Sequence, residues 1–223
     1  MEKIIIFLNG VYSDNLEKIK SLCTNRKIIA VDGGTNMIYK LDLIPDKIVG
    51  DMDSINNEAL KFYKNKDIEI IKLDKEKDHT DFEVALLDYV PNKTGRFKNQ
   101  NIEKENFDNL INTDILVLGA TGNRLDMTMS NLKKLHSLPN MYFISENFET
   151  IKYINKSTDF KNLKGKTFSI IPITDIEEIT LIGFKYPLNK NNISKDFGLV
   201  SNIVENNLCT VKFKKGEMYI IYM

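Results

Sequence analysis

Two carboxylates separated by a single residue, Asp51 and Asp53, follow the apolar run Lys47–Val49. Carboxylate oxygens at this spacing can converge on one cation where a strand has ended and the backbone turns. Magnesium binds one or two carboxylates together with water and phosphate oxygens, so the pair predicts a metal–nucleotide site. A polar turn in which Asp53 or Ser54 caps a following helix is the alternative interpretation.

A second acidic segment contains Asp78 and Asp81, three residues apart at the start of a helical pattern. At the beginning of a helix, both carboxylates would face one ligand. Thr80 and Glu83 fit a capping box, which explains these two residues without any ligand. The capping box does not require Asp78, so Asp78 and Asp81 remain candidate ligand-binding residues.

Another strand-like run, Ile28–Val31, leads into Asp32, Gly33 and Gly34. Glycine permits positive φ and lets the backbone approach a ligand closely. A helix that begins after Gly34 would direct its amide groups toward a phosphate. The three residues are therefore candidate nucleotide-binding residues, and a plain strand-to-helix turn is the alternative.

The run Ile115–Leu118 is followed by a Gly-x-x-Gly turn, Gly119–Gly122, and then by Arg124 and Asp126. Arg124 offers a planar fork for phosphate oxygens. The segment is not a P-loop, because no Gly-Lys-Ser/Thr follows, and its spacing does not fit the dinucleotide fingerprint. A helix cap with Arg124 in a surface ion pair is the alternative.

Apolar and β-branched runs recur along the first two-thirds of the chain, with helical patterns between several of them. This alternation predicts an α/β domain in which a mostly parallel sheet lies between two layers of helices. The carboxyl ends of such strands meet at one edge of the sheet, which would bring the four segments together. The runs are Ile4–Leu8, Ile28–Val31, Lys47–Val49, Ile68–Ile71, Ile115–Leu118 and Met141–Ile144.

The last third of the chain shows short strand-like runs separated by Gly, Pro and Asn. This pattern predicts a C-terminal antiparallel β-sandwich. We therefore expect two domains, residues 1–147 and 148–223. Residues 91–113 contain few apolar side chains and are predicted to be a surface insertion.

Charge and cysteine content narrow the classes of partner. Lys plus Arg equals 31 and Asp plus Glu equals 31, which gives no support for a nucleic-acid or membrane partner. No apolar run approaches the roughly 18 residues that span a bilayer, and the first residues read as a strand rather than a signal peptide. Cys23 and Cys209 form no motif, so we expect neither a zinc site nor a disulfide framework, and a cytoplasmic location.

Taken in order, these segments resemble the thiamine pyrophosphokinase (thiamine diphosphokinase) family. The shared motifs are Asp-Gly-Gly, Gly-Asp-x-Asp-Ser, Lys-Asp-x-Thr-Asp-x-Glu and Gly-Ala-Thr-Gly-x-Arg-x-Asp. Lys185–Leu188 and Gly198–Asn202 are similar to that family's Lys-Tyr-Pro-Leu and Gly-x-Ser-Asn segments, so the resemblance covers nearly the whole chain. Two positions depart from the family pattern, because Met127 stands where His is usual and Ile203 where Glu is frequent.

The resemblance implies an enzyme that transfers the diphosphate of ATP to the primary hydroxyl of thiamine and releases AMP. It also implies a homodimer with active sites at the subunit interface, with ATP and magnesium on the α/β domain. The implied catalytic residues are Asp51, Asp53, Asp78, Asp81 and Arg124, of which the four aspartates would hold the metal.

The resemblance assigns further residues to substrates. Asp126 would orient Arg124 or touch the substrate, and thiamine would lie near Ser201 and Asn202 of the partner's β-sandwich. Two other classes remain open. One is a metal-dependent glycosyltransferase or nucleotidyltransferase, and the other is a non-catalytic nucleotide sensor.

Overall fold

The computed structural model describes residues 2–74, 80–86 and 113–223 of the chain. Asp78 and residues 91–112 of the predicted insertion lie outside these ranges. The chain divides into two compact units, Met1–Asn147 and Phe148–Met223. No helix in the described ranges combines the length and apolar character needed to cross a membrane.

The first unit is built on a six-stranded sheet in which every recorded pair of strands is parallel. The strand order is β4-β3-β2-β1-β5-β6. In each of β1, β2 and β5, four of the five residues are buried, as expected where helices cover both faces. The strands are β1 (Lys3–Phe7), β2 (Lys27–Val31), β3 (Lys47–Gly50), β4 (Glu69–Lys72), β5 (Asp114–Leu118) and β6 (Met141–Ile144).

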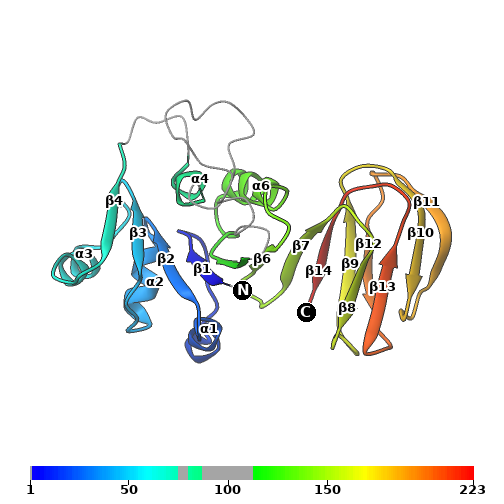
Figure 1. The fold of residues 1–223 in the computed structure, drawn as a ribbon, viewed down its shortest axis with the longest axis horizontal. Coiled ribbons are helices and arrows are strands. Elements are labelled where there is room, and N and C mark those ends of the chain that lie inside the picture. Colours follow the sequence, from blue (N-terminus) through cyan, green and yellow to red (C-terminus); the bar gives the residue numbers. More distant parts are fainter. Residues whose placement is uncertain (1, 75–79, 87–112) are drawn as a thin grey trace. The chain divides into compact units, whose positions relative to one another are not determined.

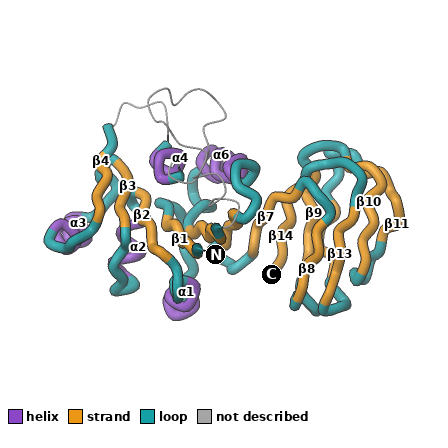
Figure 2. Tube along the Cα trace, in the orientation of Figure 1, coloured by secondary structure: helices purple, strands orange, loops and turns teal. Residues whose placement is uncertain are grey.

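Helices cover both faces of this sheet. In Figures 1 and 2, α1 (Leu16–Leu22) and α2 (Gly34–Lys40) lie on one face, and α4 (Asp81–Ala85) and α6 (Leu125–Lys134) lie on the other. The remaining described helix, α3 (Asn57–Lys64), packs against α2. The predicted three-layer α/β/α domain is therefore confirmed.

The strand order reverses next to β1. The chain runs outward through β2, β3 and β4, and then returns to place β5 on the other side of β1. The loops that follow β1 and β5 therefore leave the sheet toward opposite faces. In open α/β sheets, ligands bind at such a switch point, beyond the carboxyl ends of the strands.

The second unit contains two four-stranded antiparallel sheets, ordered β12-β9-β14-β7 and β11-β10-β13-β8. Alternate residues point into a shared core, in which the Phe168 ring packs against Phe160, Phe184 and Tyr222. This confirms the predicted antiparallel β-sandwich. The strands are β7 (Thr150–Ile154), β8 (Thr158–Lys161), β9 (Thr167–Pro172), β10 (Ile176–Ile182), β11 (Leu188–Ile193), β12 (Leu199–Ile203), β13 (Leu208–Lys212) and β14 (Met218–Tyr222).

Candidate active site

The segment Asp51–Ser54, here called the acidic loop, leaves the carboxyl end of β3 in a sharp turn. Gly50 has φ 152° and Met52 has φ 70°, so the backbone bends on both sides of Asp51. The amide of Asp53 donates to Oδ1 of Asp51 at 3.0 Å. This turn brings two carboxylates, two residues apart, to the same side of the loop.

Helix α3 does not depend on the acidic loop for its cap. Its N-cap is Asn56, whose side chain accepts a hydrogen bond from the amide of Ala59 at 2.8 Å. The alternative in which Asp53 or Ser54 caps this helix is therefore wrong. Neither the Asp51 nor the Asp53 carboxylate serves as the cap of α3.

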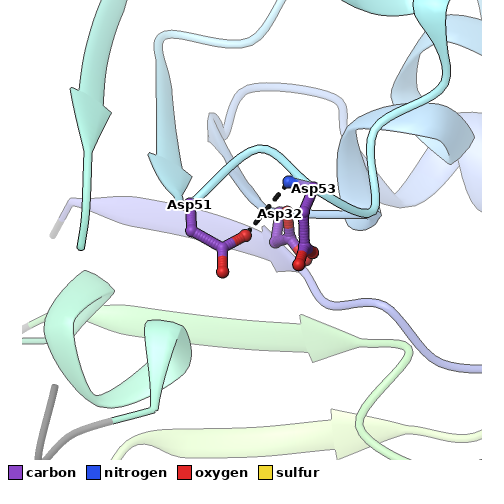
Figure 3. Close-up of side chains that lie close together, drawn as sticks. All are labelled: Asp32, Asp51 and Asp53. Carbon is purple, nitrogen blue, oxygen red and sulfur yellow. Dashed lines mark hydrogen bonds between the residues drawn. The ribbon is translucent and has the colours of Figure 1, made fainter. Parts of the chain in front are cut away.

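Asp32 lies beside the acidic loop because β2 and β3 are neighbours in the sheet. Its amide donates to the carbonyl of Val49 at 2.8 Å, and its own φ is 45°. Carboxylate oxygens of Asp32, Asp51 and Asp53 all lie within 4.8 Å of one another. Figure 3 shows the three side chains converging from the two strand ends. The structure thus joins Asp32, predicted as a nucleotide-binding residue, to the predicted metal ligands.

The electrostatics of this cluster favour a cation. Only 8% of Asp32 is exposed, and its Oδ1 accepts no hydrogen bond from the described residues. Burial raises the pKa of Asp32, hydrogen bonds from Ser54 lower it, and repulsion from Asp51 and Asp81 raises it further. Three carboxylates that each offer an oxygen within 4.8 Å of the others fit a hard divalent cation such as Mg²⁺.

Asp81 is the first residue of α4, and Thr80 is the N-cap of this helix. The amide of Thr80 donates to Glu83 Oε2 at 2.8 Å, and the amide of Glu83 donates to Thr80 Oγ1 at 3.2 Å. The other Glu83 oxygen accepts from Lys134 of α6. The predicted capping box is confirmed, and Glu83 is explained by helix packing. Asp81 is half-buried and close enough to Asp32 to affect its pKa.

The role predicted for the backbone of Gly33 and Gly34 needs correction. Gly33 has φ −58° and caps α2, and neither glycine has positive φ, which belongs instead to Asp32. A Cβ on Gly34 would lie 2.1 Å from the carbonyl oxygen of Phe7, and one on Gly33 would lie 2.3 Å from the Asn9 side chain. Both positions have no room for a larger residue, because α2 packs directly against the end of β1 and the residues after it.

A cavity of about 410 Å³ opens at the switch point of the sheet. Its walls come from the loops that follow β1, β2 and β5 and from the first turns of α4 and α6. Asp32, Asp81 and Arg124 all line it. Asp32 therefore belongs both to the cavity wall and to the carboxylate cluster, and connects the two.

The segment Gly119–Gly122, here called the glycine loop, forms one wall of this cavity. The amide of Val11 donates to the carbonyl of Thr121 at 3.0 Å, and the Thr121 hydroxyl donates to Glu146 at 2.8 Å. The buried Asn131 side chain donates to the carbonyl of Ala120 at 2.9 Å. Neighbouring elements thus hold the loop from several sides.

Sequence reasoning missed three neutral residues at this cavity, Asn9, Gly10 and Asn131. Asn9 and Gly10 directly follow the first strand-like run, which is the signal that could have found them. A Cβ on Gly10 would lie 2.1 Å from the carbonyl oxygen of Gly119, so the β1 and β5 loops touch there. No comparable local signal marks Asn131 within its helix.

Arg124 and Asp126 form the surface ion pair that was the alternative interpretation. Arg124 Nε and one terminal nitrogen donate to the two Asp126 oxygens at 2.9 and 2.6 Å. This fork lowers the pKa of Asp126 to about 2. The side chains are 73% and 66% exposed, so Arg124 can exchange Asp126 for phosphate oxygens without crossing a packed core.

In the second unit, Ser201 and Asn202 are consecutive residues of β12 in different environments. Ser201 is exposed, has φ 60°, and its amide donates to Ser169 Oγ at 3.0 Å. Asn202 is buried, accepts from the amide of Tyr186 at 3.1 Å and donates to the Tyr186 carbonyl at 2.8 Å. Asn202 thereby fixes the Tyr186 turn, whereas Ser201 is an exposed residue.

A parallel three-layer α/β domain with a cavity at its switch point, and carboxylates beside it, defines a class of nucleotide-binding α/β proteins. Residues 19–145 match the family model of the thiamin pyrophosphokinase catalytic domain, and residues 152–218 match that of the thiamin pyrophosphokinase vitamin B1 binding domain. The chain belongs to the thiamine pyrophosphokinase family, as its motifs predicted.

Individual relatives agree with this assignment. Thiamine pyrophosphokinase of Bacillus subtilis is 30% identical over 207 residues, covering 86% of this chain and 85% of that protein. Thiamine pyrophosphokinase 1 of Arabidopsis thaliana is 27% identical over 217 residues, covering 86% and 76%. The crystal structure of the Bacillus subtilis enzyme superposes with a TM-score of 0.76 at 26% identity, covering 99% of this chain and 98% of that chain. Thiamin pyrophosphokinase from Candida albicans, 22% identical, shares the fold with a TM-score of 0.77 over 99% and 88% of the chains.

Proposed function

We propose that this chain is a thiamine diphosphokinase that transfers the diphosphate of ATP to the hydroxyethyl oxygen of thiamine. The observation that carries the proposal is the convergence of Asp32, Asp51 and Asp53 beside the switch-point cavity, in a member of this family. In the reaction, the thiamine hydroxyl oxygen bonds to the β-phosphorus, the bond from that phosphorus to the α–β bridging oxygen breaks, and AMP and a proton are released. Such chemistry depends mainly on alignment and charge stabilisation.

The residues at the cavity have separate roles in this proposal. Asp32, Asp51 and Asp53 hold magnesium together with Asp81, directly or through water, and Asp78 remains a further predicted ligand outside the described residues. Bound magnesium would neutralise charge on the phosphate oxygens.

The glycine loop and Arg124 are assigned to the nucleotide. The glycine loop forms a wall for the nucleotide, and its glycines let it pack tightly on the segment after β1. A Cβ on Gly119 would lie 2.5 Å from the carbonyl oxygen of Leu8, and one on Gly122 would lie 2.9 Å from the amide nitrogen of Val11. Arg124 turns from Asp126 to the phosphates, and Asp126 keeps its fork near the cavity when no nucleotide is bound. Gly33 and Gly34 act indirectly, by letting α2 approach β1.

We assign thiamine to the second unit, which matches the vitamin B1 binding domain over residues 152–218. Ser201 offers an exposed hydroxyl to this substrate, and Asn202 shapes its surroundings through Tyr186. We also propose a homodimer in the cytoplasm. Large exposed apolar side chains on this unit, including Phe197 at 68% and Val200 at 62%, support self-association. Both cysteines are free, which supports the cytoplasmic location. Molar mass by light scattering tests the dimer, and a monomer at micromolar concentration contradicts it.

The decisive experiment is an AMP-release assay with ATP and Mg²⁺ in the presence and absence of thiamine. Thiamine-dependent AMP formation, with thiamine diphosphate as the second product, supports the kinase. AMP or diphosphate release that depends on a different acceptor supports another nucleotide-dependent transferase. ATP binding without turnover for any acceptor supports the nucleotide sensor and contradicts the proposal.

A further inference from the structure

A single side chain of α2 bridges the segment that directly follows the acidic carboxylates. Asn36 Nδ2 donates to the carbonyl of Ser54 at 2.9 Å, and Asn36 Oδ1 accepts from the amide of Asn56 at 2.9 Å. The amide group of Asn36 thus uses both its donor and its acceptor on backbone groups two residues apart. This contact fixes the end of the acidic loop to a helix rather than to its own strand.

Helix α2 is a rigid reference for that loop. Gly34, its first residue, packs so closely on the backbone of β1 that a Cβ would lie 2.1 Å from the Phe7 carbonyl oxygen. Asp32 sits two residues before this helix, and the amide of Thr35 donates to the Asp32 carbonyl at 3.0 Å. Asp32 and Asn36 are therefore placed by the same short helix.

The acidic loop itself contains strained backbone. Met52 has φ 70°, and a residue other than glycine keeps such a conformation only where the surroundings hold it. The three carboxylates also repel one another when no cation lies between them. A loop under both strains would relax away from Asp32 unless an outside contact restrained it.

We propose that Asn36 is a positioning residue that holds the acidic loop against Asp32, so that the three carboxylates are assembled for a divalent cation before it binds. The inference rests on the proposed function only in assigning the cation to phosphoryl transfer. Asn36 touches neither metal nor substrate in this role. An amide is required, because alanine has neither donor nor acceptor and a carboxylate has no donor for the Ser54 carbonyl.

Asn36→Ala tests the role by Mn²⁺ titration of the nucleotide-free protein, followed by electron paramagnetic resonance. Contacts that orient metal ligands commonly change metal affinity by 10- to 100-fold, so we expect the Mn²⁺ Kd to rise about 10-fold. The Mg²⁺ concentration for half-maximal AMP release should rise by a similar factor, with the KM for thiamine unchanged.

Asn56→Ala is the matched control. It removes the side-chain cap of α3 but keeps the backbone amide that Asn36 accepts from. We expect a lower Tm and a Mn²⁺ Kd within about twofold of wild type. Equal weakening in both variants would show a general stability effect and overturn the proposal.

Two further outcomes would also overturn the positioning role of Asn36. Wild-type Mn²⁺ affinity in Asn36→Ala overturns the positioning role, and so does a wild-type protein that binds no Mn²⁺ at millimolar concentration without nucleotide. A different pair of results is expected if the positioning role is right but the proposed kinase function is wrong. In that case Mn²⁺ binding still depends on Asn36, but no variant, wild type included, releases AMP in response to thiamine.

Discussion

The acidic loop and the glycine loop leave the same sheet but are stabilised in opposite ways. The glycine loop is neutral, and Ala120 and Thr121 hydrogen-bond with Val11 in the loop after β1, with Asn131 of α6 and with Glu146. The carboxylates around the acidic loop concentrate negative charge, and the buried Oδ1 of Asp32 has no hydrogen-bond partner among the described residues. Protein groups hydrogen-bond the glycine loop, whereas the acidic loop gathers like charges at the place proposed for a cation.

This difference predicts how the two loops respond to change. A neutral, hydrogen-bonded wall serves as a preformed surface for a nucleotide and gains little from metal. A cluster of like charges is a less stable arrangement that metal binding stabilises. Substitutions of the acidic-loop carboxylates should therefore lower activity without lowering stability, whereas substitutions within Gly119–Gly122 should lower both.

The largest expected effect comes from Asp51→Asn. Loss of one charged metal ligand should lower kcat/KM for thiamine-dependent AMP release by about 10³-fold, in the range seen when transition-state charge stabilisation is removed. The Tm in EDTA should stay equal or rise, because a repulsive charge is gone. Turnover within a few-fold of wild type, with unchanged Mg²⁺ dependence, would refute the role of Asp51.

The acidic side chains were predictable from sequence because their evidence is local. A carboxylate pair after an apolar run marks Asp51 and Asp53 as candidate metal ligands without any knowledge of tertiary structure. The sequence predicted that the Asp32 segment would lie near this pair, but not that the Asp32 carboxylate would join its cluster, because that depends on the direct pairing of β2 with β3 and on the positive φ of Asp32 itself. Gly33 was misread for a similar reason, since the Asn9 side chain that crowds it is distant in sequence.

Neutral amides were the other gap in the sequence prediction. Asn36 and Asn131 matter through one or two hydrogen bonds to backbone carbonyls or amides in other loops. An isolated Asn in a helical pattern has no spacing that reveals such a contact. The fold, in contrast, followed from periodicity alone, because buried parallel strands and alternating sandwich strands differ in pattern over several residues.

The second prediction concerns Gly50, the last residue of β3, which directly precedes the acidic loop. Gly50→Ala should destabilise the protein by about 3 kcal/mol, because φ is 152° and the new Cβ would lie 2.9 Å from the Asp32 Cβ. Gly165→Ala is the matched control, with φ 80° and no atom within 4 Å, and should cost about 1 kcal/mol. Urea unfolding measures both, and equal losses would show that crowding at Asp32 contributes nothing.

The third prediction uses the raised pKa of Asp32. A carboxyl whose pKa is higher in the folded state contributes stability below its unfolded pKa and loses it as pH rises through the folded pKa. In EDTA, Asp32→Asn should therefore be more stable than wild type at pH 7, on the order of 1 kcal/mol. The advantage should shrink toward pH 4. A difference that is constant with pH in urea unfolding would contradict the assigned cause.

The smallest effect is expected at the exposed pair beside the glycine loop. Asp126→Asn removes the partner that holds the Arg124 fork, and should raise the KM for ATP by about threefold because more Arg124 conformations must be restricted on binding. The urea midpoint at pH 7 should not change, since both side chains face solvent.

A double-variant cycle shows whether Asp126 acts only through Arg124. Arg124→Gln should raise the KM for ATP about 10-fold by removing a charge-assisted contact to phosphate. The double variant should then match Arg124→Gln alone, because Asp126 has nothing left to orient. Additive effects on KM would mean that Asp126 contacts a substrate directly and not only through Arg124.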